Sequence, residues 1–277
     1  MYSDILLPMV TYPDASSKRV ATSATSLAKG LGAQLHAVAL EVDVPDISNA
    51  LSNALIDLPK LIRDAEAASH ARGERLLRIV ADRAASLGIE FRLDSIRVRE
   101  SMFAPFAASA ARYHDLSAIG WEPGNPTARV VAEALIFESG RPVVLLPDAE
   151  TPDLGHVAIA WDASRVAARA VADALPFLRN ANAISILVVT DEKPIREKGG
   201  AELLSDFLAK RGLRSSTHLV RAAGRGIGET LQAEAQKRGS ELLVMGAYGH
   251  SRLRQFVLGG ATSGILQDLR MPVLLSH

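Results

Sequence analysis

The sequence contains no cysteine among its 277 residues. Disulfide bonds, thiolate metal sites and cysteine nucleophiles are therefore excluded, and the cysteine usage gives no argument for export. The chain also lacks an excess of charge of either sign, because 31 basic residues balance 31 acidic residues and the formal net charge at pH 7 is zero. A global basic field that would draw the chain onto nucleic acid or an anionic membrane is thus absent.

Long hydrophobic runs are missing as well. No apolar stretch approaches the roughly 20 residues that are needed to cross a bilayer. The first residues enter a strand-like segment without the basic leader of a signal peptide. The seven histidines do not have the spacing of metal ligands, so no protein metal site is predicted. These absences predict a soluble cytoplasmic protein that binds neither membranes nor nucleic acid.

What the chain does contain is an internal repeat. Its length suits two domains of about 140 residues, and a hydrophobic content of 48% supplies apolar side chains for two cores. Residues 140–147 and 269–275 both enter a short apolar run through arginine and proline. The polar segment 148–153, which contains a proline, separates the two copies. We predict one domain over residues 1–148 and a second over residues 154–277.

Each copy alternates strands with helices. The strands are mostly unbroken apolar runs and the helices are rich in alanine and leucine, which is typical of a parallel sheet covered on both faces. Right-handed crossovers then give two tandem doubly wound α/β domains, each with a five-stranded parallel sheet. Strands are predicted at residues 4–9, 34–42, 90–98, 115–120, 142–146, 155–161, 183–190, 214–221, 241–246 and 272–276. Helices are predicted at residues 16–30, 60–87, 102–113, 127–138, 164–180, 199–211, 226–238 and 257–269.

Glycines are concentrated after the fourth strand of the second copy. Residues 246–263 read GAYGHSRLRQFVLGGATS, in which two glycines separated by two residues are followed by a basic spacer of nine residues and two more glycines. Glycine lets main-chain N–H groups approach phosphate oxygens, and the start of the next helix offers unpaired N–H donors. A structural turn is the alternative interpretation. The candidate phosphate-binding residues are Gly246, Gly249, His250, Arg252, Gly259, Gly260, Ala261 and Thr262.

Two further segments of the second copy follow predicted strands. Asp162 comes after the first strand, where its carboxylate can accept a hydrogen bond from a ribose hydroxyl or an adenine amine. The alternative is that Asp162 or Ser164 caps the next helix. Val189 ends the second strand, where its main-chain groups can pair with a base edge. Ligands of open parallel sheets lie beyond the carboxyl ends of the strands, so we predict that these segments form one site.

These residues together resemble the ATP-binding branch of the universal stress protein family, whose fold is of the adenine nucleotide alpha hydrolase type. The family pattern is Gly, two residues, Gly, nine residues, Gly and then Ser or Thr, and Gly246, Gly249 and Gly259 match it in register. The resemblance implies that Asp162 holds the ribose and that Val189 contacts adenine. The predicted nucleotide site is completed by Ala160, Ser164, Met245 and the candidate phosphate-binding residues given above.

One residue of the second copy departs from the family pattern, and the first copy departs more widely. Gly260 stands where the family has Ser or Thr, which removes one phosphate hydrogen bond worth about 1 kcal/mol; the hydroxyl of Thr262 can replace it. In the first copy Gly124 is out of register, Glu122 brings a negative charge and two prolines remove N–H donors. We predict that the first copy does not bind the nucleotide, and binding of another small molecule there stays open.

The resemblance implies a regulatory or stress-response protein that binds ATP or AMP, with any Mg²⁺ brought by ATP, and that is not an enzyme. A slow ATPase or nucleotidyl transferase is the main alternative, although no Walker-type lysine and no suitable water-activating carboxylate is present. A scaffold with a vestigial glycine loop is the third. In tandem members of the family the final strands pair, so residues 142–146 and 272–275 are expected to join the copies as a pseudo-dimer. A homodimer of two chains stays open.

Overall fold

The computed structural model describes residues 2–45, 57–122, 124–149, 154–191, 199–247 and 261–277. Its strands form one sheet with the order β3-β2-β1-β4-β5-β10-β9-β6-β7-β8. The strands of the first half are β1 Asp4–Val10, β2 Gln34–Val42, β3 Phe91–Val98, β4 Leu116–Gly120 and β5 Val143–Leu146. Those of the second half are β6 His156–Ala160, β7 Ala183–Val189, β8 Ser216–Val220, β9 Leu242–Gly246 and β10 Val273–Ser276.

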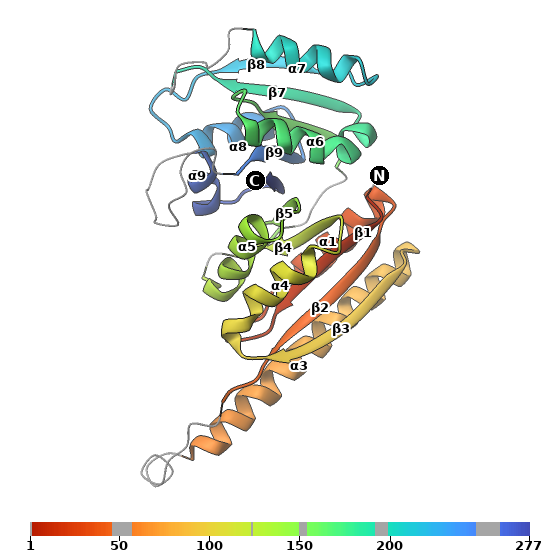
Figure 1. Cartoon of the computed structure of the whole chain (residues 1–277), viewed down its shortest axis with the longest axis vertical. Coiled ribbons are helices and arrows are strands. Elements are labelled where there is room, and N and C mark those ends of the chain that lie inside the picture. Colours follow the sequence, from red (N-terminus) through yellow and green to blue (C-terminus); the bar gives the residue numbers. More distant parts are fainter. Residues whose placement is uncertain (1, 46–56, 123, 150–153, 192–198, 248–260) are drawn as a thin grey trace.

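The helices cover both faces of this sheet (Figure 1). The helices of the first half are α1 Lys18–Leu31, α3 Leu58–Leu87, the short 3-10 helix η1 Glu100–Met102, α4 Phe103–Ala111 and α5 Pro126–Glu138. Those of the second half are α6 Arg165–Asn180, α7 Gly200–Ala209, α8 Ile227–Lys237 and α9 Ala261–Gln267. One core cluster joins the sheet to α1, α3, α6 and α7, and a second joins it to α4, α5, α8 and α9. The predicted doubly wound arrangement is therefore confirmed in each half.

The two halves meet through their final strands. β5 and β10 pair in antiparallel orientation, with Leu274 opposite Val144, whereas the other strand pairs of the sheet are parallel. Both strands are fully buried. This pairing confirms the expected pseudo-dimer, and it makes the sheet continuous from one half to the other.

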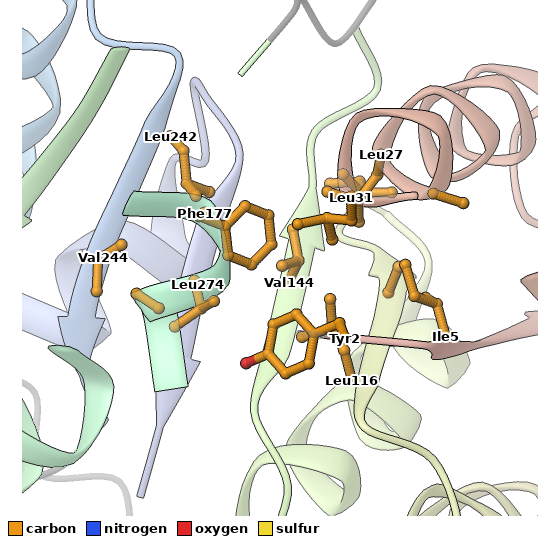
Figure 2. Packing of buried hydrophobic residues seen from close by; sticks show 14 of the residues in the cluster. Tyr2, Ile5, Leu27, Leu31, Leu116, Val144, Phe177, Leu242, Val244 and Leu274 are labelled. Atoms are coloured by element: carbon orange, nitrogen blue, oxygen red, sulfur yellow. The ribbon is translucent and has the colours of Figure 1, made fainter. Parts of the chain in front are cut away.

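Side chains of the two halves contact each other on both faces of the sheet at this junction. On one face the ring of Tyr2 contacts the edge of Phe177 at a centroid distance of 5.9 Å, next to Val144 and Leu274 (Figure 2). On the other face the indole N–H of Trp121 donates a hydrogen bond of 2.8 Å to the carbonyl of Leu266. The halves therefore share apolar and polar contacts across the β5–β10 junction.

The predicted boundaries agree with the structure to within a few residues, and the start of α1 shows why they differ. The Ser17 hydroxyl caps α1 by accepting the N–H of Val20, and the Ser16 hydroxyl bonds back to the N–H of Val10. The helix therefore begins at Lys18 instead of at residue 16. For the predicted helix 257–269, the structure gives Ala261–Gln267 as α9, and residues 257–260 lie outside the described residues.

Candidate functional site

Three neighbouring strands of the second half end at one edge of the sheet. β9, β6 and β7 are adjacent and parallel, so their carboxyl ends lie side by side. Gly246 ends β9, Ala160 ends β6 and Val189 ends β7. The chain leaves β6 toward β7 on one side, while β9 lies on the other side, so the strand order reverses between β6 and β9. Ligands of open α/β sheets bind at such a point.

Asp162 stands at this point in a fixed conformation. Its side chain is exposed, and its Oδ1 accepts the main-chain N–H of Ser164 at 3.0 Å. The residue between them, Ala163, has a φ of 56°, which lies in the left-handed region that residues with a Cβ seldom adopt. The turn holds the exposed carboxylate at the carboxyl edge, where a donor from solvent or a ligand can reach it.

Ser164 uses its hydroxyl as the cap of α6. The side chain is buried, and Oγ accepts the N–H of Ala167 at 3.2 Å. This is the capping role that the sequence left open for Asp162 or Ser164, and it satisfies one of the unpaired donors of the first helical turn. A contact between Ser164 and a nucleotide stays a prediction.

Gly246 is required by packing at the end of β9. A Cβ at this position would lie 2.5 Å from the carbonyl carbon of Val166 and 2.6 Å from the nitrogen of Ala167, both in the first turn of α6. The preceding residue, Met245, is buried in the core with 3% of its surface exposed. The glycine therefore lets the end of β9 lie directly against the start of α6.

Helix α9 begins at the same edge. Because β9 and β10 are parallel, the helix that connects them runs back from the carboxyl edge, so Ala261 and the buried Thr262 lie at its start there. Gly228 of α8 fixes this position, since a Cβ on it would lie 2.6 Å from the carbonyl oxygen of Ala261 and from the nitrogen of Ile265. The structure thus brings both ends of the predicted phosphate loop to the edge that carries Asp162.

Five of the predicted nucleotide-binding residues fall within the segment 248–260, which lies outside the described residues. They are Gly249, His250, Arg252, Gly259 and Gly260. Their part in the site stays a prediction from the sequence.

Asp191 has a role at this edge that the sequence did not reveal. Its two carboxylate oxygens accept the N–H groups of Ala222 and Ala223 at 2.7 and 3.0 Å, which ties the segment after β8 to the end of β7. These N–H groups, that of Ala223 foremost, hold the pKa of the Asp191 carboxyl below its usual value. The only signal in the sequence was an aspartate directly after a predicted strand.

Trp161 belongs to the core wall. Its ring packs against the cluster beneath α6 and α7, and its indole N–H donates to the carbonyl of Gly200 at 3.0 Å.

The equivalent edge of the first half holds a carboxylate of its own. Oε1 of Glu122 accepts the N–H of Ser17, the cap of α1, at 2.8 Å. A Cβ on Gly120 would lie 2.9 Å from the same oxygen, so the glutamate fills the space at the end of β4. Burial raises the pKa of the Glu122 carboxyl above its usual value, and the Asp148 carboxylate adds to the shift. The Glu122 side chain thus places a carboxylate at the amino-terminal end of α1.

No group of three or more His, Asp and Glu residues in the described part of the chain has an arrangement that could hold a metal ion. No helix among the described residues is long and apolar enough to cross a membrane.

The fold and this edge define a tandem doubly wound α/β protein with a candidate ligand site in its second half. The model of the universal stress protein family matches residues 154–277. This part of the chain is therefore a universal stress protein domain. No relative was found among curated protein sequences.

Solved structures extend the likeness of fold to the whole chain. A universal stress protein from Archaeoglobus fulgidus DSM 4304 aligns with a TM-score of 0.72 at 16% identity, over 99% of this chain and 97% of that chain. A functionally unknown protein from Pseudomonas aeruginosa PAO1 aligns with a TM-score of 0.59 at 18% identity, over 99% and 92% of the two chains. The cytoplasmic domain of a prokaryotic cation chloride cotransporter has a TM-score of 0.51 at 11% identity, over 99% and 95%. Likeness at these identities describes the fold and not the activity.

Proposed function

We propose that residues 154–277 bind an adenine nucleotide, ATP or AMP, at the carboxyl edge of β9, β6 and β7. Binding serves a regulatory or stress-response role, in which the nucleotide favours one conformation through its differential affinity. Sustained catalysis is not part of this proposal, because the sequence lacks a Walker-type lysine and a carboxylate suited to activating water.

The observation that carries the proposal is the position of the Asp162 carboxylate. It lies exposed at the point where the strand order reverses, and the Ser164 amide holds one of its oxygens. The other oxygen is suited to accept a hydrogen bond from a ribose hydroxyl. Val189 at the end of β7 and Gly246 at the end of β9 flank this position on either side. The glycine pattern that begins at Gly246 in the sequence supplies the main-chain N–H groups that donate hydrogen bonds to the phosphates.

Calorimetric titration with ATP, ADP and AMP tests the site. We expect Asp162→Ala to weaken binding by about ten- to a hundredfold, because a hydrogen bond to a charged group contributes about 1.5–3 kcal/mol. Gly249→Val is expected to weaken binding through the phosphate loop. Asp14→Ala, the exposed aspartate before α1 in the first half, is the matched control and should bind like the parent.

Phosphate release measured on the same samples separates the regulatory role from slow hydrolysis. Steady release that is lost in His250→Ala would favour the enzyme. In the titration, unchanged affinity in both Asp162→Ala and Gly249→Val would reject the site. If the parent binds no nucleotide at millimolar concentration, the result would favour the scaffold with a vestigial glycine loop.

A further inference from the structure

Two histidines contact each other near the amino-terminal edge of the sheet in the first half. Nδ1 of His36, on β2, lies 2.9 Å from Nε2 of His114, which precedes β4. Nε2 of His36 lies 2.8 Å from Oδ2 of Asp94 on β3, and Nδ1 of His114 lies 2.9 Å from the carbonyl oxygen of Ala110 on α4. A chain of three hydrogen bonds therefore links β3, β2, α4 and the start of β4.

A count of protons fixes the charge of this pair. The bond to the Asp94 carboxylate needs a proton on His36, and the bond to the Ala110 carbonyl needs a proton on His114. The bond between the rings needs a third proton on one of the two facing nitrogens. Two neutral imidazoles carry only two N–H protons, so all three bonds form together only when the pair holds one added proton.

Neighbouring groups act on the protons of this pair in both directions. The carboxylate of Asp94 faces His36, and Oδ2 of Asp4 on β1 lies 3.6 Å from Nε2 of His114. Arg92 of β3 contacts the same oxygen of Asp94 at 2.6 Å. Burial lowers the pKa of the His36 ring below its usual value, against the effect of Asp94, and charge on His114 and Arg92 lowers it further.

The remaining ionisable groups around the pair are accounted for by other contacts. Asp115 accepts the N–H and the hydroxyl of Ser3 and the N–H of Asp4, and Tyr113 lines a cavity of about 240 Å³ beside the rings. In the described part of the second half, Ser185 is the third residue of β7, as His36 is of β2, and its hydroxyl lies 2.9 Å from Nε2 of His156.

We propose that His36 and His114 form an acid-sensitive latch on the first half, closed while the two rings share one added proton and opened when a second proton arrives. A second proton leaves no lone pair between the facing nitrogens, so an N–H would point at an N–H across 2.9 Å. The ring–ring bond then breaks.

Long-range ¹H–¹⁵N spectra of the histidine rings test the proton count directly on the full chain. We expect a shared N–H between His36 Nδ1 and His114 Nε2 that is lost when the pair takes up a second proton on acidification. Two neutral rings without a shared N–H would overturn the proposal.

Hydrogen exchange measures the opening of the latch. We expect exchange at the start of β1 and β2, corrected for intrinsic rates, to rise by about tenfold per pH unit below the second protonation, because opening takes up one proton. His114→Gln removes the titration and should abolish this rise, whereas the control His156→Gln should retain it. A rise that persists in His114→Gln, or no rise in the parent, would contradict the latch.

Discussion

At the scale of single residues, one pair of carboxylates shows how the two halves have diverged. In the second half Oδ1 of Asp162 accepts the N–H of Ser164, which caps α6. In the first half Oε1 of Glu122 accepts the N–H of Ser17, which caps α1. The first carboxylate belongs to the turn after the first strand, and the second comes from the segment after the fourth strand. The N–H of the capping serine is therefore bonded to a carboxylate in both halves, but the carboxylate comes from a different segment in each.

Replacing Glu122 by Gln should raise the stability of the chain at neutral pH. The folded-state pKa of Glu122 is raised, so its favourable contribution is present at low pH and is lost as the pH rises through that pKa. Glutamine keeps an acceptor for the Ser17 N–H without the charge. Urea denaturation from pH 4 to pH 7 should show parent and variant alike at the acid end and the variant more stable at the neutral end.

Glu90→Gln is the control for this experiment, because the side chain of Glu90 is exposed. It should follow the parent at every pH. A Glu122→Gln variant that is less stable than the parent at pH 7 would show that the charge itself stabilises the start of α1.

At the scale of elements, the packing of α9 on α8 depends on an absent side chain. Ala at position 228 would place its Cβ 2.6 Å from main-chain atoms of α9. We expect Gly228→Ala to destabilise the second half by about 1–3 kcal/mol, as overpacking commonly does. Gly226→Ala is the matched control, because a Cβ there meets no atom within 4 Å. Thermal unfolding measures both, and equal stability of the two variants would refute the close approach.

The elements are also where sequence-based prediction succeeded best. Strand and helix order and the two cores follow from local apolar runs and from the repeat, whereas the β5–β10 pairing was implied by the family resemblance. The start of α1 was placed too early because the bond from Val10 N–H to Ser16 depends on the fold of the preceding turn. The partners of Glu122 and Asp191 were not predicted, since their contacts span 105 and 31 residues. The sequence shows that these positions carry carboxylates, but only the fold shows which N–H groups they bind.

At the scale of the whole molecule, the halves share their cores across the β5–β10 junction. Val144 and Leu274 lie opposite each other and belong to the cluster that also contains Tyr2 and Phe177 (Figure 2). An interface built from strand pairing and a common core couples the stability of both sides. The halves should therefore unfold together.

Leu274→Asp tests this coupling. The side chain is fully buried, so an unpaired carboxylate there should cost at least about 3 kcal/mol. Amide hydrogen exchange during a urea titration reports separately on β2 of the first half and on β7 of the second half. The urea transitions of both strands should shift to lower concentration by the same amount. Val130→Asp, at a position that is 57% exposed, is the control and should shift neither. Loss of only the second half's transition would refute the coupling.

The antiparallel union of two otherwise parallel strand sets also decides which way each half faces. The carboxyl ends of β1–β5 and those of β6–β10 point to opposite rims of the shared sheet. The rim that carries Asp162 is thus continued by the amino-terminal ends of the first half's strands, where His36 and His114 meet. A partner that binds along this rim contacts the carboxyl edge of the second half and the amino-terminal edge of the first half. A flat partner cannot touch both carboxyl edges at once.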